Sequence, residues 1–168
     1  MNRAYLEKKP RNNSGFSLIE VLITILIVSF GLLGMAALIL SGARSNNIAH
    51  YRSIASKQTE DIADRMRANL AGVSAGSYNA LAANIPESGD CLTNTCNAIQ
   101  VAAYDHAQWN TANSRLLPGG SGTVNGNVAT GFEITLMWIE KEMNGQEDSA
   151  CPGGTPVNTR CFLTRISP

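Results

Sequence analysis

Few features of this sequence point to catalysis or to nucleic-acid binding. The 168 residues carry 13 basic and 13 acidic side chains, so the formal net charge is zero, and only 15% of the residues are charged. A nucleic-acid-binding domain usually has a basic excess, which is missing here. The sequence also lacks a phosphate-binding loop, a serine-nucleophile motif and a paired-carboxylate signature. We therefore expect a non-enzymatic protein that has no cofactor and does not bind nucleic acid.

Two groups of polar side chains resemble sites only superficially. His106 follows Asp105, but neighbouring residues on a helix point about 100° apart, so this pair is not preorganised for acid–base chemistry. A second group consists of acidic residues of the kind that bind Ca²⁺, namely Glu140, Glu142, Glu147 and Asp148. A solvated acidic loop is the preferred interpretation of this group, and we expect no metal site.

A long segment without charge follows the N-terminus. No charged residue occurs from Val21 to Ala43, and a helix of that length spans roughly 35 Å, enough to cross a membrane. Residues 1–15 carry a net charge of +3, which by the positive-inside rule keeps this end in the cytoplasm. Everything after Arg44 is then expected on the far side of the membrane.

All four cysteines lie in the part expected to be exported: Cys91, Cys96, Cys151 and Cys161. An even number of cysteines in an oxidising compartment indicates disulfides, and four cysteines allow three pairings. The local pairing, Cys91–Cys96 with Cys151–Cys161, is favoured because each pair brackets a short, turn-rich segment. The spacing of Cys91 and Cys96 is poor for zinc, and neither pair has a nearby histidine.

Glu20 stands near the start of the apolar run, where a carboxylate is costly. A cleaved signal peptide has a shorter apolar region, and an ordinary membrane anchor does not explain the glutamate. The stretch SGFSLIE, residues 14–20, resembles the processing motif of type IV prepilins and pseudopilins. The resemblance implies that a membrane peptidase cuts between Gly15 and Phe16 and then methylates the amine of Phe16.

This cut explains the glutamate physically. The new amine of Phe16 is a cation at the edge of the lipid, and it needs a carboxylate there as much as Glu20 needs a cation. In a bundle of parallel helices, Glu20 of one subunit can pair with the Phe16 amine of the next. We therefore expect Glu20 to set the register of subunit assembly.

The remaining sequence predicts an α+β protein. Helical spacing of apolar residues after Arg44 predicts one helix from near Phe16 to about Ala71, ended by Gly72 and Gly76. A second helix is expected at residues 97–116, strands at 122–128, 131–141 and 160–166, and a loop at 144–159. We expect a small antiparallel sheet to pack on the long helix, which is the pilin fold that the resemblance implies.

These expectations divide the chain into four segments. They are a cleaved basic leader (1–15), the membrane and assembly half of the long helix (16–43), its amphipathic half (44–71) and a periplasmic globular head (72–168).

Several stretches beyond the N-terminus resemble the minor pilin group called PilV: DIADRMRANLAG, AYDHAQW, LLPGGSGTV and FEITLMWIEK. This resemblance implies a minor pilin that takes part in initiating type IV pilus assembly. Its partners would be the major pilin, other minor pilins, prepilin peptidase and the inner membrane, and its final place the pilus fibre or tip. The alternatives are a type II secretion pseudopilin, an anchored periplasmic binding module, and a secreted protein released after Ala43.

Overall fold

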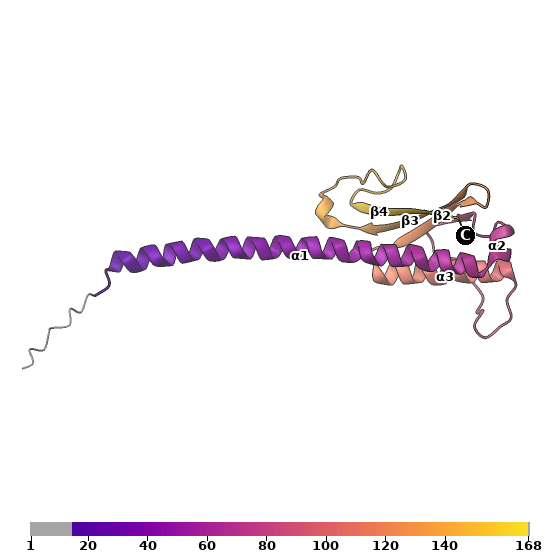
Figure 1. Ribbon diagram of the computed structural model, residues 1–168, viewed down its shortest axis with the longest axis horizontal. Coiled ribbons are helices and arrows are strands. Elements are labelled where there is room, and N and C mark those ends of the chain that lie inside the picture. The colour runs from indigo at the N-terminus through magenta and orange to yellow at the C-terminus, as the bar shows by residue number, and fades with distance from the viewer. Residues whose placement is uncertain (1–14, 168) are drawn as a thin grey trace, which may run out of the picture. The chain divides into compact units, whose positions relative to one another are not determined.

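The computed structural model describes residues 15–167. Residues 1–14 of the expected leader lie outside the described part. In chain order the elements are α1 (Leu18–Ala68), α2 (Leu70–Ser74), β1 (Ala80–Leu81), α3 (Ala98–Leu116), β2 (Ser121–Asn127), β3 (Gly131–Ile139), the short 3₁₀ turn η1 (Lys141–Met143) and β4 (Thr159–Ile166). Figure 1 shows these elements. The chain divides into two compact units, an N-terminal unit up to Asn46 and a C-terminal unit from Asn47 onward.

The N-terminal unit consists of the first part of α1 and the residues before it. Its apolar side chains are exposed all round the helix. The hydroxyl of Thr24 donates to Val21 O at 2.8 Å, and that of Ser29 donates to Ile25 O at 2.7 Å. These polar side chains are therefore satisfied within the helix, as a lipid environment requires.

The C-terminal unit contains a four-stranded antiparallel sheet in the order β1-β2-β3-β4. Alternation along β3 places its apolar side chains on one buried face, namely Phe132, Ile134, Leu136 and Trp138. The expected α+β class with a small antiparallel sheet and a second, shorter helix is confirmed. The two-residue strand β1 was not predicted, because a pair of residues carries no measurable periodicity.

The core of this unit is shared by helices and sheet. Buried residues of α1, including Ile62 and Met66, cluster with Trp109 of α3 and with the buried face of β3. The indole Nε1 of Trp109 donates to Gln58 O of α1 at 2.8 Å. A Cβ added at Gly122 of β2 would lie 2.3 Å from the Trp109 ring, so only glycine lets α3 and β2 approach this closely.

Asn69 ends the long helix after Ala68, so the expected stop at Gly72 is wrong. The second expected stop, Gly76, follows the end of α2 with a φ of 77°. Asn69 leaves the helical conformation (φ −119°, ψ 57°), and its side-chain oxygen accepts a hydrogen bond from Gly72 N at 3.1 Å. Its amide also donates to Ala98 O at 2.8 Å. Gly72 lies inside α2, where a Cβ would lie 2.9 Å from that same carbonyl. The chain turns here because the Asn69 side chain caps the start of α2. Gly72 instead allows the backbone of α2 to lie close to Ala98.

Helix α3 begins at the Asn97 cap and ends at Leu116, as predicted from the sequence. The Asn97 side chain accepts from the backbone of Gln100, and the Gln100 side chain accepts from Asn97 N, which together form a capping box. Burial on this helix does not follow the apolar residues alone. Ile99 and Leu116 are exposed, whereas two asparagines of this helix, Asn110 and Asn113, are buried.

Candidate functional site

The predicted processing point lies just before α1. Gly15, Phe16 and Ser17 are exposed and non-helical, and the Phe16 side chain is 85% exposed. The carbonyl of Ser17 accepts hydrogen bonds from Glu20 N at 3.0 Å and Val21 N at 3.3 Å, which starts the helix. The Gly15–Phe16 peptide bond is therefore outside regular structure, where a peptidase can bind extended backbone.

Glu20 lies in the first turn of α1. A negative side chain at this position interacts favourably with the partial positive charge of the helix N-terminus. The surrounding residues are apolar and exposed, among them Leu18, Ile19, Leu22 and Ile23. Within residues 15–167, α1 is the one helix that is long and apolar enough to cross a membrane. This part of the chain thus fits a membrane anchor with a single acidic group near its start.

Comparison with protein families supports this interpretation of the N-terminus. Residues 10–36 match the prokaryotic N-terminal methylation motif, and this range contains Gly15, Phe16 and Glu20. The match indicates a type IV pilin-like protein. The motif covers the start of the chain and leaves the C-terminal unit unmatched. Searches of curated proteins and of solved structures each returned no match.

The candidate pair Asp105 and His106 has structural partners in the C-terminal unit. Tyr78 donates to Asp105 Oδ2 at 2.6 Å, and Arg65 Nη1 donates to Asp105 Oδ1 at 3.2 Å. Burial, followed by the bond to Asp105, raises the pKa of Tyr78. His106 instead lies 2.8 Å from Ala82 O through Nε2. His106 and Asp105 therefore hold different parts of the chain.

The four cysteines form the two local disulfides, Cys91–Cys96 and Cys151–Cys161. Cys91 and Cys96 close a short loop before α3. Cys151 anchors the loop that follows η1 to β4, because Cys161 is a residue of that strand. Both bonds suit the oxidising compartment that the sequence predicts.

The acidic group is only partly the solvated loop that the sequence suggested, because Glu142 and Glu147 are exposed, whereas Glu140 and Asp148 pair with an arginine. Glu140 is 4% exposed and accepts two hydrogen bonds from Arg160, at 3.0 and 3.1 Å. Asp148 also pairs with Arg160, at 3.5 Å. Burial opposes ionisation of Asp148, but hydrogen bonds from the amides of Ala150 and Cys161 and the charge of Arg160 outweigh it, so its pKa lies below the ordinary value. The sequence pattern did not reveal that Arg160, which is distant from Glu140 in the chain, pairs with these carboxylates.

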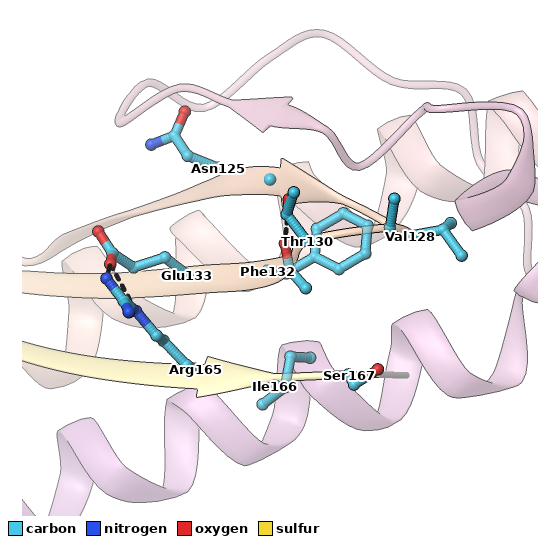
Figure 2. Close-up of a pocket in the computed structure, with 11 residues that line it drawn as sticks. Asn125, Val128, Thr130, Phe132, Glu133, Arg165, Ile166 and Ser167 are labelled. Carbon is cyan, nitrogen blue, oxygen red and sulfur yellow. Dashed lines mark hydrogen bonds and ion pairs between the residues drawn. The ribbon is translucent and has the colours of Figure 1, made fainter.

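The described residues contain no cluster of three or more side chains suited to holding a metal ion. A hollow with a volume of about 700 Å³ lies at the end of the sheet where β2 turns into β3 and β4 ends. Figure 2 shows Glu133 and Arg165 paired at its side, with Val128, Phe132 and Ile166 around it. The hollow is open and mixed in polarity, so it suits contact with another chain better than enclosure of a small molecule.

Proposed function

We propose that this protein is a minor pilin of type IV pili, made as a precursor and cut by prepilin peptidase between Gly15 and Phe16. The observation that carries the proposal is the order of features at the N-terminus. An exposed, non-helical Gly15–Phe16 bond is followed within one turn by Glu20 and then by an apolar helix.

The proposed reaction converts a precursor into an assembly unit. Hydrolysis after Gly15 leaves a protonated amine on Phe16, and methylation keeps its positive charge. An unpaired charge in an apolar region costs several kcal/mol, so the amine of one subunit and the Glu20 carboxylate of another favour association. Pairing between neighbours shifts each subunit along the axis by a fixed step and thus specifies a filament.

The four segments expected from the sequence take defined roles in this proposal. Residues 1–15 are the cytoplasmic leader, and residues 16–43 lie in the inner membrane before they enter the filament. Residues 44–71 connect this segment to the head, and residues 72–168 form the head in the periplasm. The two disulfides support the placement of the head, because disulfides persist in the periplasm and are rare in the cytosol.

The finer assignment is to the PilV group of minor pilins, which start assembly together with other minor pilins. It is supported by the four stretches within residues 61–141 that resemble this group. A type II secretion pseudopilin would share the N-terminal motif, and deletion separates these two functions. Loss of surface pili with normal protein secretion supports the minor pilin, and the opposite result supports the pseudopilin.

The mass of the mature chain tests the processing step. In cells with prepilin peptidase, we expect loss of residues 1–15 and a gain of one methyl group on Phe16. The variant Gly15→Leu should accumulate as the full-length precursor in the membrane, whereas Gly31→Leu, a change with open space around it, should be processed normally. A wild-type chain that keeps its initiator methionine, or that starts near Arg44, would contradict the proposal.

A further inference from the structure

We propose that the second half of the outer edge of β4 binds an extended segment of another pilin subunit, with a carboxylate side chain opposite Arg165. This inference rests on the proposed function, because it names a contact through which the head joins other subunits. The observations behind it concern the backbone of β4, the loop beside it, and the side chains of Glu133 and Arg165.

The direction of the peptide groups along β4 follows from their partners. Strand β4 is the last in the sheet, so one of its sides pairs with β3 and the other faces outward. On the outer side, Thr159 N donates to Pro156 O and Cys161 N donates to Asp148 Oδ2, both at 3.3 Å. Peptide groups of a strand alternate in direction with a period of two. Those of Leu163 and Arg165 therefore face outward as well.

Only the first half of this outer edge is covered. The loop that contains Asp148 and Pro156 lies along Thr159 and Cys161 and is fixed there by the Cys151–Cys161 disulfide. Within residues 15–167, the outward N–H groups of Leu163 and Arg165 have no hydrogen-bond partner. An edge with free donors and acceptors is a template for another strand, and many proteins bind extended segments in this way.

The side chain of Arg165 defines the chemistry of the incoming segment. Arg165 is directly opposite Glu133 in the register of β3 and β4, and its side chain is 81% exposed. Its Nε and Nη2 atoms both donate to Glu133 Oε2, at 3.1 and 3.0 Å. No described residue accepts from Nη1. A residue of the added strand that lies directly opposite Arg165 would have its Cβ about 5 Å from that of Arg165. A carboxylate at this position would therefore accept hydrogen bonds from the N–H groups of Arg165 that Glu133 leaves free.

Two neighbouring features extend the same surface. Leu163 is 41% exposed on the same face as Arg165, which favours an apolar side chain beside it. The hollow shown in Figure 2 begins at Arg165, Ile166 and Ser167, so it continues the open edge. The segment that fits has an acidic residue, an apolar residue two positions away on the same face, and an end that reaches the hollow.

Photocrosslinking in piliated cells tests the contact on the full chain. We would place p-benzoylphenylalanine at Leu163 and, as the matched control, at the exposed Ser114 of α3. We expect an adduct at position 163 with another pilin, joined at an extended segment that contains an acidic residue, and none at position 114. No adduct at position 163, or an adduct only with a protein other than a pilin, overturns the proposal.

Proline substitution tests the backbone. Because the N–H of Leu163 faces outward, Leu163→Pro removes no bond of the β3–β4 ladder, whereas Thr164→Pro removes one. Leu163→Pro should fold and yet enter filaments about tenfold less than the wild type. This factor is expected when one intersubunit backbone hydrogen bond is lost and the adjacent ones are weakened. Thr164→Pro should be degraded. Wild-type incorporation of Leu163→Pro overturns the proposal.

If Leu163→Pro fails to fold, charge reversal at Arg165 still tests whether this edge binds an acidic segment. The double variant Glu133→Arg with Arg165→Glu keeps an internal ion pair but presents a negative charge to the incoming carboxylate. The control exchanges the exposed pair Asp64 and Arg67 of α1. Only the first exchange should reduce incorporation, and equal incorporation overturns the proposal. If the wild-type N-terminus is unprocessed, the proposed function fails instead, which the mass of the chain shows separately.

Discussion

The hydroxyl of Tyr78 donates a 2.6 Å hydrogen bond to Asp105 across 27 residues of sequence. This bond joins the turn after α2 to the middle of α3. Asn69 donates to the Tyr78 oxygen from the other side, at 3.1 Å, and Arg65 of α1 binds the second oxygen of Asp105. One buried group thus connects the end of the long helix with both elements that follow it.

Tyr78→Phe should destabilise the C-terminal unit by about 1–3 kcal/mol, because the buried Asp105 and the half-buried Asn69 both lose a hydrogen-bond partner. Both tryptophans of the chain, Trp109 and Trp138, lie in this core, so their fluorescence during guanidinium unfolding in mild detergent measures the loss. A loss equal to that of Tyr104→Phe, a half-buried tyrosine of α3, would contradict this role.

The same variant should change the alkaline response. The pKa of Tyr78 is raised in the folded state above its ordinary value of 10.0, so its contribution is complete below about pH 10 and is lost as pH rises further. The wild type should therefore lose stability above this pH more steeply than Tyr78→Phe. Parallel curves for the two proteins would show that the hydroxyl ionises equally easily in both states.

Asp148→Asn should flatten the acid limb of stability. The pKa of Asp148 is lowered on folding, so its contribution is present above about pH 4 and is lost as pH falls. Unfolding of the full chain between pH 2 and 6 measures this limb. The control is Asp64→Asn, since Asp64 is an exposed carboxylate of α1; an equal effect of both changes would exclude a special role of Asp148.

Glu140→Ala should cost about 2–3 kcal/mol of stability, since it leaves Arg160 partly buried with only the longer pairing to Asp148. Glu133→Ala is the matched control, because Glu133 also bonds an arginine of β4 but in an exposed pair, where we expect less than about 1 kcal/mol. Equal losses in guanidinium unfolding would contradict the distinction between the two pairs.

Gly122→Ala should destabilise the C-terminal unit by about 1–3 kcal/mol through overpacking. The added methyl group would lie 2.3 Å from the rigid Trp109 ring, which is also hydrogen-bonded to α1. Gly153→Ala adds the same group where nothing lies within 4 Å and should leave stability almost unchanged. Equal denaturation midpoints for both variants would show that the ring can move aside.

The sequence predicted most elements because local signals agreed there. The helix expected at residues 97–116 and the strand expected at residues 131–141 agree closely with α3 and β3. The end of α1 was misplaced because Gly72 suggested a stop, whereas Asn69 acts through Tyr78 and Ala98, which come close only after folding. Glu140 was misread for the same reason, since its partner Arg160 lies 20 residues away. The N-terminal methylation motif at residues 10–36 is different, because it is defined by its linear sequence and does not depend on contacts made after folding.

The exposed surface from Leu18 to Leu40 is apolar apart from Glu20 and a few small or hydroxyl side chains, and this has a consequence for the energetics of moving between environments. Hydrocarbon tails and the side chains of neighbouring helices are similar solvents for leucine and isoleucine, so extraction from a bilayer into a helical bundle changes the hydrophobic free energy little. A preference for the bilayer or for the helical bundle must then come from the few polar or charged groups whose free energy differs between the two environments. The transfer free energy of such a long apolar helix is therefore close to zero, and a single carboxylate can determine its sign.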